Sequence, residues 1–413
     1  MAGYSYQDFV TTSPTYPSYL ANLSTDGQPI VSSPAGPYPF RTQYTILSYY
    51  GRANLNIKDR YLLTATLRND ASSRFNEDNR NALFPAASVA WRIKSETFLK
   101  DNTTFTDLKL RVGYGRTGQQ DVYGIAGDYP TVQRYVQNNQ QANYLFGGVP
   151  FNPYSPQGFN SNLKWETTTT YNAGVDFGFL EGRLTGSVDA YYRKTTDLLN
   201  GIFLGGLTNF TNYYVFNVGA LENRGVEVNV NAIPVQTTNF TWNINANATY
   251  NRNKILSLGN QQPGFPGIET LGVPGGTGTN IGIFAVGESA SAFYVYKQVY
   301  DTNGKPLNDV YADLNNDGKV DTNDRYLYKQ SAPPVILGFT SNMAYKKLSL
   351  AFTLRSNLSN YVYNSVNAQN GNYQGINYST NYLTNVTQDA NFTQFPNTTQ
   401  NRYSSDYYIQ NAS

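Results

Sequence analysis

Six residues between positions 313 and 324 have the types and the spacing of a calcium-binding loop. Oxygen-bearing side chains stand at loop positions 1, 3, 5, 9 and 12, a glycine at position 6 permits the tight turn, and position 7 contributes a backbone carbonyl. The expected ligands are Asp313, Asn315, Asp317, Lys319 through its carbonyl, Asp321 and Asp324, with Gly318 at the turn. The sequence therefore predicts a structural Ca²⁺ site.

The last ligand position of this loop is Asp324 rather than the usual Glu, so closing the coordination shell needs a closer approach of the backbone. The flanking residues have an extended rather than a helical pattern. This pattern favours a structural site over a calcium sensor. The alternative is an ordinary solvated turn rich in Asn, Asp and Gly.

Catalytic chemistry has little support in the composition. The 413 residues include no Cys and no His, which removes thiol chemistry, Ser-His triads and almost every zinc site. A surface glycoside hydrolase would need paired carboxylates, and no spacing among Glu166, Glu222 and Glu227 singles out an acid and a nucleophile. We predict that the chain is not an enzyme. Its net charge of +2 gives no reason to expect a nucleic acid partner.

The elements that carry this loop are strands, and the clearest pair lies between Trp165 and Arg193. Apolar residues alternate with small or polar ones from Tyr171 to Phe179, and again from Leu184 to Tyr192. Glu181-Gly182 supplies the turn between them. Each arm has about ten residues or more, which suits a strand that crosses a bilayer at a tilt.

The same alternation recurs in about a dozen segments, always with one apolar face. Short turns at 58–59, 181–182, 234–239 and 346–347 alternate with long loops at 71–82, 117–163, 194–224 and 253–292. Outer-membrane barrels have tight periplasmic turns and long external loops. The pattern predicts an all-β fold, an antiparallel transmembrane β-barrel with long extracellular loops. A soluble solenoid or carbohydrate-binding array is the alternative.

The composition also favours a wall between lipid and water. Only 14% of the residues are charged, against roughly 25% in soluble proteins, and the 36 Tyr are a residue type favoured at bilayer interfaces. No apolar run is long enough for a membrane-spanning helix, and the first residues do not form a signal peptide. We expect residues 3–9 to be a strand whose partner lies upstream, and residues 357–413 to contain no strand.

The alternation assigns side chains to two surfaces and to the loops. The expected lipid contacts are Val175, Phe177, Leu184, Val188, Leu350 and Phe352. The expected lumen charges, which would pack against a plug or line the substrate path, are Arg52, Arg68, Lys109, Arg111, Asp176, Asp189 and Arg193; the plug contact is the favoured role. Loop aromatics that could stack on sugar rings, pack the loops or contact a partner are Tyr123, Tyr129, Tyr135, Tyr144, Phe146 and Tyr154. None of them is assigned as a ligand.

Longer runs carry a resemblance to a known family. SYYGRANLNIKDRYLLTATLRNDASSRF, LFPAASVAWRI, FTDLKLRVGYGRTGQQ, LKWETTTTYNAGVDFGFLEGRLTGSVDAYYRKTTDLL, LENRGVEV and DLNNDGKVDTNDR, with Gly338-Phe339, closely resemble the SusC/RagA family of TonB-dependent outer-membrane transporters. The resemblance covers most of the chain. It implies a barrel of about 22 strands with an N-terminal plug, a SusD-like surface lipoprotein that closes over the barrel as a lid, and import of glycans or oligopeptides with energy from TonB.

The resemblance also implies boundaries and a location. Residues 1–413 are expected to be a segment of the receptor β-barrel, without the signal peptide, the plug, the TonB box and the final strands, and residues 313–324 a calcium-type loop within an extracellular insertion. The expected surroundings are the outer membrane of a Gram-negative, Bacteroidota-like cell, with its lipid, the lipoprotein, the TonB complex (through the absent N-terminal part) and a glycan or peptide ligand. Glycan is favoured as the cargo. A surface glycan-binding or adhesive protein without transport is the alternative function.

Overall fold

The main body of the protein is one antiparallel sheet. The computed structural model describes residues 1–14, 16, 18–23, 26, 28–33, 40–122, 127–137, 144–151, 153–203, 213–259, 264–276, 278–376, 385–397 and 399–413. Within these residues the sheet has 11 strands in the order β1-β4-β5-β6-β7-β12-β13-β16-β17-β24-β25. Their bounds are Ala2–Ser13 (β1), Phe40–Ile57 (β4), Tyr61–Ser72 (β5), Asn81–Arg92 (β6), Phe105–Gln119 (β7), Glu166–Phe179 (β12), Leu184–Thr196 (β13), Ala220–Gln236 (β16), Phe240–Ser257 (β17), Val335–Tyr345 (β24) and Leu348–Leu358 (β25).

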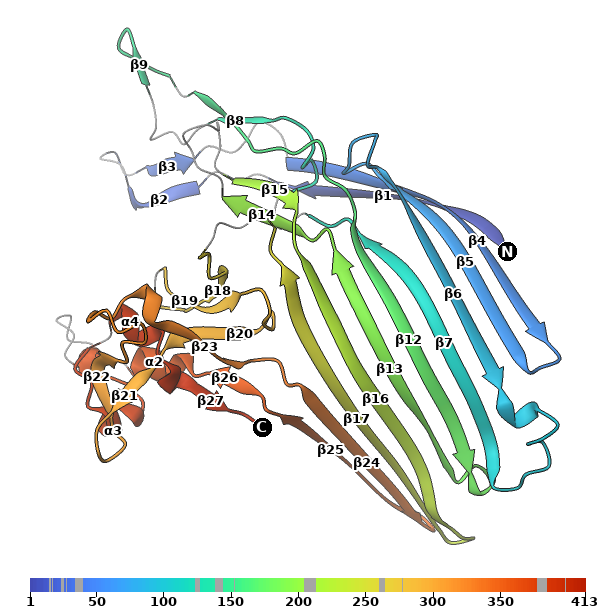
Figure 1. The fold of residues 1–413 in the computed structure, drawn as a ribbon. Coiled ribbons are helices and arrows are strands. Elements are labelled where there is room, and N and C mark those ends of the chain that lie inside the picture. Colours follow the sequence, from blue (N-terminus) through green and yellow to red (C-terminus); the bar gives the residue numbers. More distant parts are fainter. Residues whose placement is uncertain are drawn as a thin grey trace.

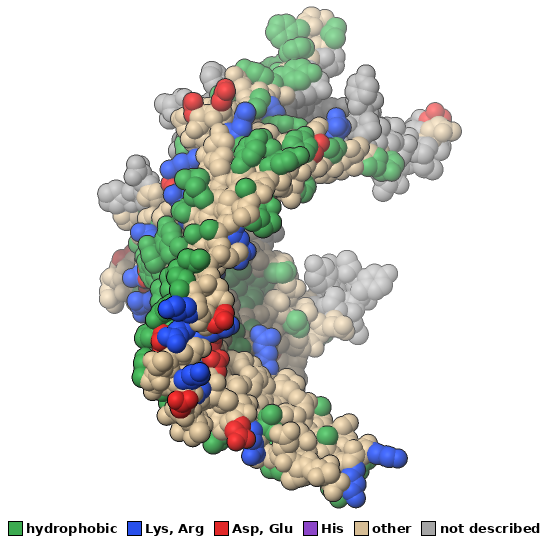
Figure 2. Space-filling model, turned by 90° about the vertical axis from the view of Figure 1, so that its right-hand side faces the viewer, with side chains coloured by type: hydrophobic (Ala, Val, Ile, Leu, Met, Phe, Trp, Pro, Cys, Tyr) green, Lys and Arg blue, Asp and Glu red, His purple; other side chains and the backbone are tan. Residues whose placement is uncertain are grey.

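The register of this sheet gives it two chemically different faces. Val175 lies opposite Leu110 of β7 and Val188 of β13, whereas the next residue, Asp176, lies opposite Lys109 and Ser187. Successive side chains of a strand point to opposite faces, so the apolar and the polar rows lie on opposite surfaces. Seen side-on, the molecule is an open arc with hydrophobic side chains gathered along the middle of its convex margin (Figure 2). The predicted all-β fold and its alternation are confirmed.

The connections are sorted between the two ends of the sheet (Figure 1). At one end lie the turns at 58–60, 180–183, 237–239 and 346–347 and the segment 93–104, with the short 3-10 helices η1 (Ile93–Ser95) and η2 (Leu180–Gly182). Lys58, Asp59, Glu181 and Lys346 have φ between 52° and 56° there, the left-handed conformation of tight hairpin turns. The turn expected at 234–239 is shorter because β16 runs to Gln236. The long connections lie at the other end, as predicted.

Several of these long connections contain hairpins of their own. The pairs are β2 (Ser18–Leu23) with β3 (Pro29–Ser33), β8 (Tyr135–Gln137) with β11 (Tyr154–Pro156), β9 (Tyr144–Phe146) with β10 (Val149–Phe151), and β14 (Leu199–Phe203) with β15 (Tyr213–Asn217). Where they meet the sheet, a small core forms from Phe75, Phe84, Val122, Leu163, Trp165, Leu199 and Val215. The loops expected at 117–163 and 194–224 are therefore partly ordered structures.

A compact outer unit forms from two segments, residues 258–334 between β17 and β24 and residues 359–413 after β25. Its strands are β18 (Ile268–Gly272), β19 (Asn280–Phe284), β20 (Ala292–Tyr296), β21 (Gln298–Tyr300), β22 (Pro306–Tyr311), β23 (Arg325–Gln330), β26 (Tyr361–Tyr363) and β27 (Ile409–Asn411). Its helices are η3 (Thr322–Asp324), α2 (Ser365–Asn370), η4 (Tyr373–Gly375), α3 (Asp389–Thr393), α4 (Gln400–Tyr403) and η5 (Asp406–Tyr408). Residues of both segments share one core of Val273, Ile281, Phe293, Val295, Ala368, Tyr403, Tyr408 and Ile409.

One of the two sequence-based expectations about the ends of the chain is wrong. Residues 357–413 contain strands and helices, because Tyr408 and Ile409 find apolar partners in the distant segment 258–334. Residues 3–9 belong to the edge strand β1, which pairs on one side with the downstream strand β4; the upstream partner expected for its other side stays a prediction. No helix among the described residues is long and apolar enough to cross a membrane.

Candidate functional site

Residues 313–324 close into a compact loop between β22 and β23. The Asp313 carboxylate accepts hydrogen bonds from the backbone N–H groups of Asp317 (3.3 Å) and Gly318 (2.9 Å), and Asn315 Oδ1 also accepts from Asp317 N–H (2.9 Å). Asp317 in turn accepts from Lys319 N–H at 2.9 Å. Gly318 has a φ of 83°, which an L side chain rarely adopts. The predicted glycine position thus makes the turn on which these oxygens converge.

Asp324 ties the end of this loop to its start. Its side chain is fully buried, with one oxygen accepting from the N–H groups of Leu314 (2.8 Å) and Asn315 (3.3 Å) and the other from Asp321 N–H (2.8 Å). These backbone hydrogen bonds, that from Asp321 first, hold the pKa of Asp324 below its usual value, and the Asp313 side chain contributes to the same lowering. The structure therefore holds the last predicted ligand against the backbone that directly follows Asp313, the first one.

The donor set of this loop is mixed. No three Asp, Glu, His or Cys side chains gather as a metal site of their own anywhere in the described parts of the chain. A cation in this loop would accordingly need the Asn315 amide oxygen and the Lys319 carbonyl beside its carboxylates. Hard oxygen donors of these three kinds are those that Ca²⁺ takes, so the residues present fit that ion, and the calcium site stays a prediction.

Four of the predicted lumen charges form one network on the polar face of the sheet. Arg111 lies 2.7 Å from Asp176 and 2.9 Å from Asp189, and Lys109 Nζ lies 2.6 Å from Asp176. Gly174 lies beneath this network, because a Cβ atom there would collide with the side chains of Asp189 and Arg111. The glycine lets the ion pairs lie flat against the sheet.

The remaining predicted lumen charges lie on the same face with local partners. Arg68 forms an ion pair with Asp70 at 2.6 Å, Arg52 donates to Asn54 at 3.1 Å, and Arg193 lies 5.7 Å from the ring centroid of Tyr191. A hollow of about 740 Å³ opens on this face, and its lining includes Thr64, Ser88, Arg111, Asp189, Arg193 and Glu227. These polar side chains, which lie among small and apolar ones in the lining, suit a surface that faces water or a plug.

The predicted loop aromatics divide into packed and exposed side chains. Tyr129 belongs to the packed group, since its hydroxyl accepts from Gln43 N–H at 3.0 Å and the Arg134 guanidinium lies 5.7 Å from its ring centroid. The exposed group, each more than half exposed, is Tyr135, Tyr144, Phe146 and Tyr154. Tyr123 lies outside the described residues. The exposed four are free to contact a ligand or a partner.

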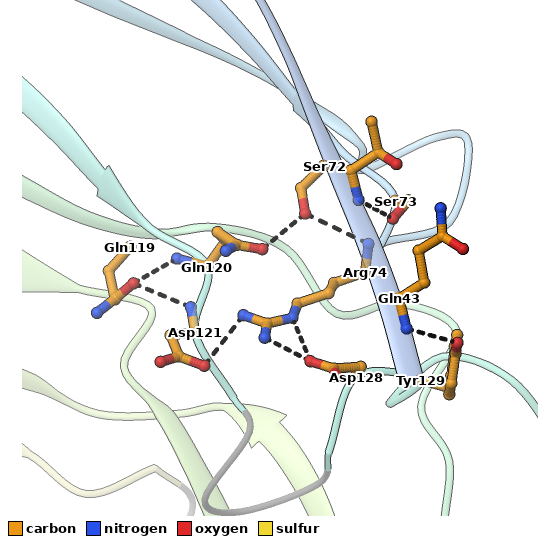
Figure 3. Close-up of polar contacts among 10 residues, drawn as sticks. Gln43, Ser72, Ser73, Arg74, Gln119, Gln120, Asp121, Asp128 and Tyr129 are labelled. Atoms are coloured by element: carbon orange, nitrogen blue, oxygen red, sulfur yellow. Dashed lines mark hydrogen bonds and ion pairs between the residues drawn. The ribbon is translucent and has the colours of Figure 1, made fainter. Parts of the chain in front are cut away.

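A buried ion pair that the sequence analysis missed fixes one long connection to the sheet (Figure 3). The Arg74 guanidinium lies 2.5 Å from Asp128 and 3.0 Å from Asp121, and its Cζ lies 3.7 Å from the ring centroid of Tyr44. The side chains of Arg74 and Asp128 are each 3% exposed. Thr131 Oγ1 also donates to the Arg74 carbonyl at 3.2 Å. These contacts hold residues 128–131 against the loop end of β5.

The three glutamates considered for catalysis have structural surroundings. Glu166 accepts from Leu199 N–H at 3.3 Å and Glu222 from the Tyr192 hydroxyl at 3.2 Å. Glu227 lies in a cross-strand row with Asp189 and Thr249. These contacts hold strands and connections together and do not pair an acid with a nucleophile.

Comparisons with known proteins agree with this architecture. Residues 1–283 match the family model described as TonB dependent receptor-like, beta-barrel. The chain is 44% identical over 91% of its length to the TonB-dependent receptor SusC of Bacteroides thetaiotaomicron, and 33% identical over 78% to the TonB-dependent receptor P26 of Formosa agariphila. It spans 37% and 32% of the lengths of these two relatives.

Solved structures show the same fold. The RagAB peptide importer in its open-open state superposes with a TM-score of 0.74 at 22% identity, covering 100% of this chain and 44% of that chain. The RagAB peptide transporter gives a TM-score of 0.70 at 23% identity, covering 94% and 42%. The chain therefore belongs to the SusC/RagA family of TonB-dependent receptors, and its sheet is a section of an outer-membrane β-barrel.

Proposed function

We propose that the complete receptor imports glycans across the outer membrane, using energy supplied through TonB and a SusD-like lipoprotein as a lid. As a member of this family the chain is part of a receptor and not an enzyme, as its sequence predicts. Transport belongs to the whole receptor, of which this chain supplies a section of the wall and much ordered structure at the loop end. Oligopeptides are the second cargo class, since the structural relative RagAB is described as a peptide importer.

The observation that carries this proposal is the 44% identity to SusC over 91% of the chain. The structure supports it in two ways. The sheet has one apolar and one polar face, as a wall between lipid and an aqueous lumen requires. Its long connections gather at one end (Figure 1), where an extracellular lid would dock.

Uptake by cells tests the transport proposal directly. A strain lacking the receptor is complemented with the receptor gene and given fluorescently labelled neutral oligosaccharides or labelled oligopeptides. We expect an oligosaccharide to accumulate in the periplasm only when the receptor is present, and accumulation to stop when tonB is deleted or a protonophore is added. If the labelled oligosaccharide instead stays at the cell surface and neither treatment changes this, the result would establish adhesion without transport.

We further propose that residues 313–324 bind Ca²⁺ and that the ion stabilises the outer unit. The support is the ligand spacing together with the fold of the loop, in which the N–H groups of Leu314 and Asn315, directly after Asp313, donate to Asp324 at the other end. A cation between such carboxylates removes their mutual repulsion and adds bonds that the unfolded chain lacks.

Thermal unfolding of the receptor with and without calcium tests the site. We expect a chelator to lower the melting temperature and added Ca²⁺ to restore it, and the variant Asp313→Asn to lose this response. Asp301→Asn is the matched control, because Asp301 also accepts backbone hydrogen bonds in a turn of the outer unit but lies outside the loop. A melting temperature that neither the chelator nor added calcium changes would reject the site.

A further inference from the structure

The outer unit contains a small polar cavity that the transport function does not account for. Its volume is about 270 Å³ and it lies between three segments: the β18–β19 hairpin, η3 at the end of the calcium-type loop, and α4 of the chain after β25. It is separate from the hollow on the lumen face, with which it shares no lining residue. The cavity therefore needs an explanation of its own.

The floor of this cavity is fixed by backbone pairing between the two segments of the outer unit. Tyr296 N–H donates to the Ser404 carbonyl at 2.7 Å, and Tyr296 forms a parallel β-bridge with Ser405. Tyr296, Ser404 and Ser405 are all buried. The lining groups are thus held in place before any ligand arrives, which lowers the entropy cost of binding.

The charges in the cavity wall cancel. Arg325 forms an ion pair with Glu269, donates to the Asn280 carbonyl at 3.2 Å, and lies with its Cζ 4.6 Å from the ring centroid of Tyr294. The Arg325 side chain is 8% exposed. The pair presents no net charge, so the cavity does not select for an ionic ligand.

Polar groups remain unsatisfied in this wall. Thr279 Oγ1 and Arg325 Nε are buried and have no hydrogen-bond partner among the described residues. Both atoms lie beneath the surface of the cavity, so a ligand would contact the accessible groups of the lining instead. The rim adds the Thr322 hydroxyl and the Asn401 amide, both on exposed residues. The accessible lining therefore offers a hydroxyl, an amide and a neutralised ion pair, which suit a small polar ligand without net charge.

We propose that this cavity binds a single sugar unit of a neutral glycan. Its volume lies just below the roughly 300–1,000 Å³ of pockets that enclose drug-sized ligands, which suits one sugar ring. The choice of a sugar over another polyol rests on the proposed glycan import. The site would hold a glycan at the cell surface, apart from the path through the barrel.

Saturation-transfer NMR on the complete receptor tests this site. The receptor is held in lauryldimethylamine oxide, since a maltoside detergent would compete, and is titrated with glucose, galactose, mannose, glucuronate and triglycine. We expect one of the neutral sugars to bind, and the double variant Thr322→Ala/Asn401→Ala to weaken it about tenfold by removing two rim hydrogen bonds. The matched control is Thr302→Ala/Asn303→Ala, the same two residue types in the exposed β21–β22 turn.

A second variant tests the neutrality argument. Glu269→Gln removes the partner carboxylate of Arg325, so we expect it to gain binding of glucuronate while the wild type binds none. The proposal is overturned if no neutral sugar binds, if triglycine or glucuronate binds the wild type instead, or if the rim variant binds as tightly as the control. Uptake by cells is measured separately, so loss of transport with sugar binding intact would count against the import function alone.

Discussion

At the scale of single residues, Arg74 shows how one buried charge orders the rim of the barrel. Replacing it with Met leaves Asp128 buried without its partner, and breaking one side of a buried ion pair typically costs about 3–5 kcal/mol. We expect Arg74→Met to release residues 127–137 from the sheet, seen as faster hydrogen exchange and new proteolytic cleavage there.

The control for this prediction is Arg80→Met in the same β5–β6 connection, because the Arg80 side chain is exposed. It should leave exchange of residues 127–137 unchanged. Equal protection of this segment in both variants would show that the Arg74–Asp128 pair does not anchor it.

Gly174 is the residue on which the lumen network of Lys109, Arg111, Asp176 and Asp189 depends. Gly174→Val places a branched side chain where Asp189 and Arg111 now lie, and overpacking of this kind costs about 1–3 kcal/mol. We expect a lower midpoint of urea unfolding. Gly51→Val is the control, since a Cβ at Gly51 meets nothing within 4 Å, and equal midpoints for the two variants would contradict the role of Gly174.

The residue-level patterns that the sequence reveals are local ones. The calcium-type loop is readable because its oxygens and its glycine stand within twelve consecutive positions and fold on one another. The Arg74–Asp128 pair joins residues 54 positions apart. The sequence around either residue does not identify the other one as its partner. The sequence does not reveal the cavity lined by Thr279 and Arg325 for the same reason, because α4, which also lines it, lies near the C-terminal end of the sequence.

At the scale of elements, the β9–β10 hairpin stands out as an apolar tip at the loop end (Figure 1). Leu145, Phe146 and Val149 are 74%, 72% and 67% exposed, and exposed apolar groups gathered in this way mark interaction surfaces. If a lipoprotein lid docks at this end, Leu145→Asp/Phe146→Asp should reduce its recovery with the affinity-purified receptor. Val132→Asp is the control, as it is 52% exposed in the same connection but outside the hairpin, and normal lid recovery with the double variant would exclude the hairpin from the interface.

The strands of the main sheet can be predicted from the sequence because one rule, the alternation of apolar and polar residues, governs all of them. Each strand of the sheet separates two environments along its whole length, so a period of two residues marks β12 and β13 as clearly as β24 and β25. The outer unit obeys no such rule: α4 and η5 are short, and their stability comes from burying Tyr403 and Tyr408 against Phe293 and Val295. A local pattern does not report contacts of this kind, which is why residues 357–413 were expected to lack strands.

At the scale of the whole molecule, the sheet is an open wall with β1 and β25 at its edges. Backbone groups that face lipid must be paired, because the bilayer core offers them no water. The curated relatives are far longer than this chain, which spans 37% of SusC. We therefore expect further strands of the complete receptor to pair with both edges and close the barrel.

The two faces of this wall can be distinguished by one substitution made at adjacent positions. Val188 lies in the apolar row with Val175 and Val228, whereas Ser187 lies in the polar row with Asp176 and Asn229. A lysine on the lipid face near the bilayer midplane costs about 2–4 kcal/mol, while a lumen position tolerates it. Val188→Lys should therefore lower the temperature at which the complete receptor loses its folded, fast-migrating band on an unboiled gel, and Ser187→Lys should leave it unchanged. The opposite order would place the apolar row inside the protein and remove the basis for a membrane wall.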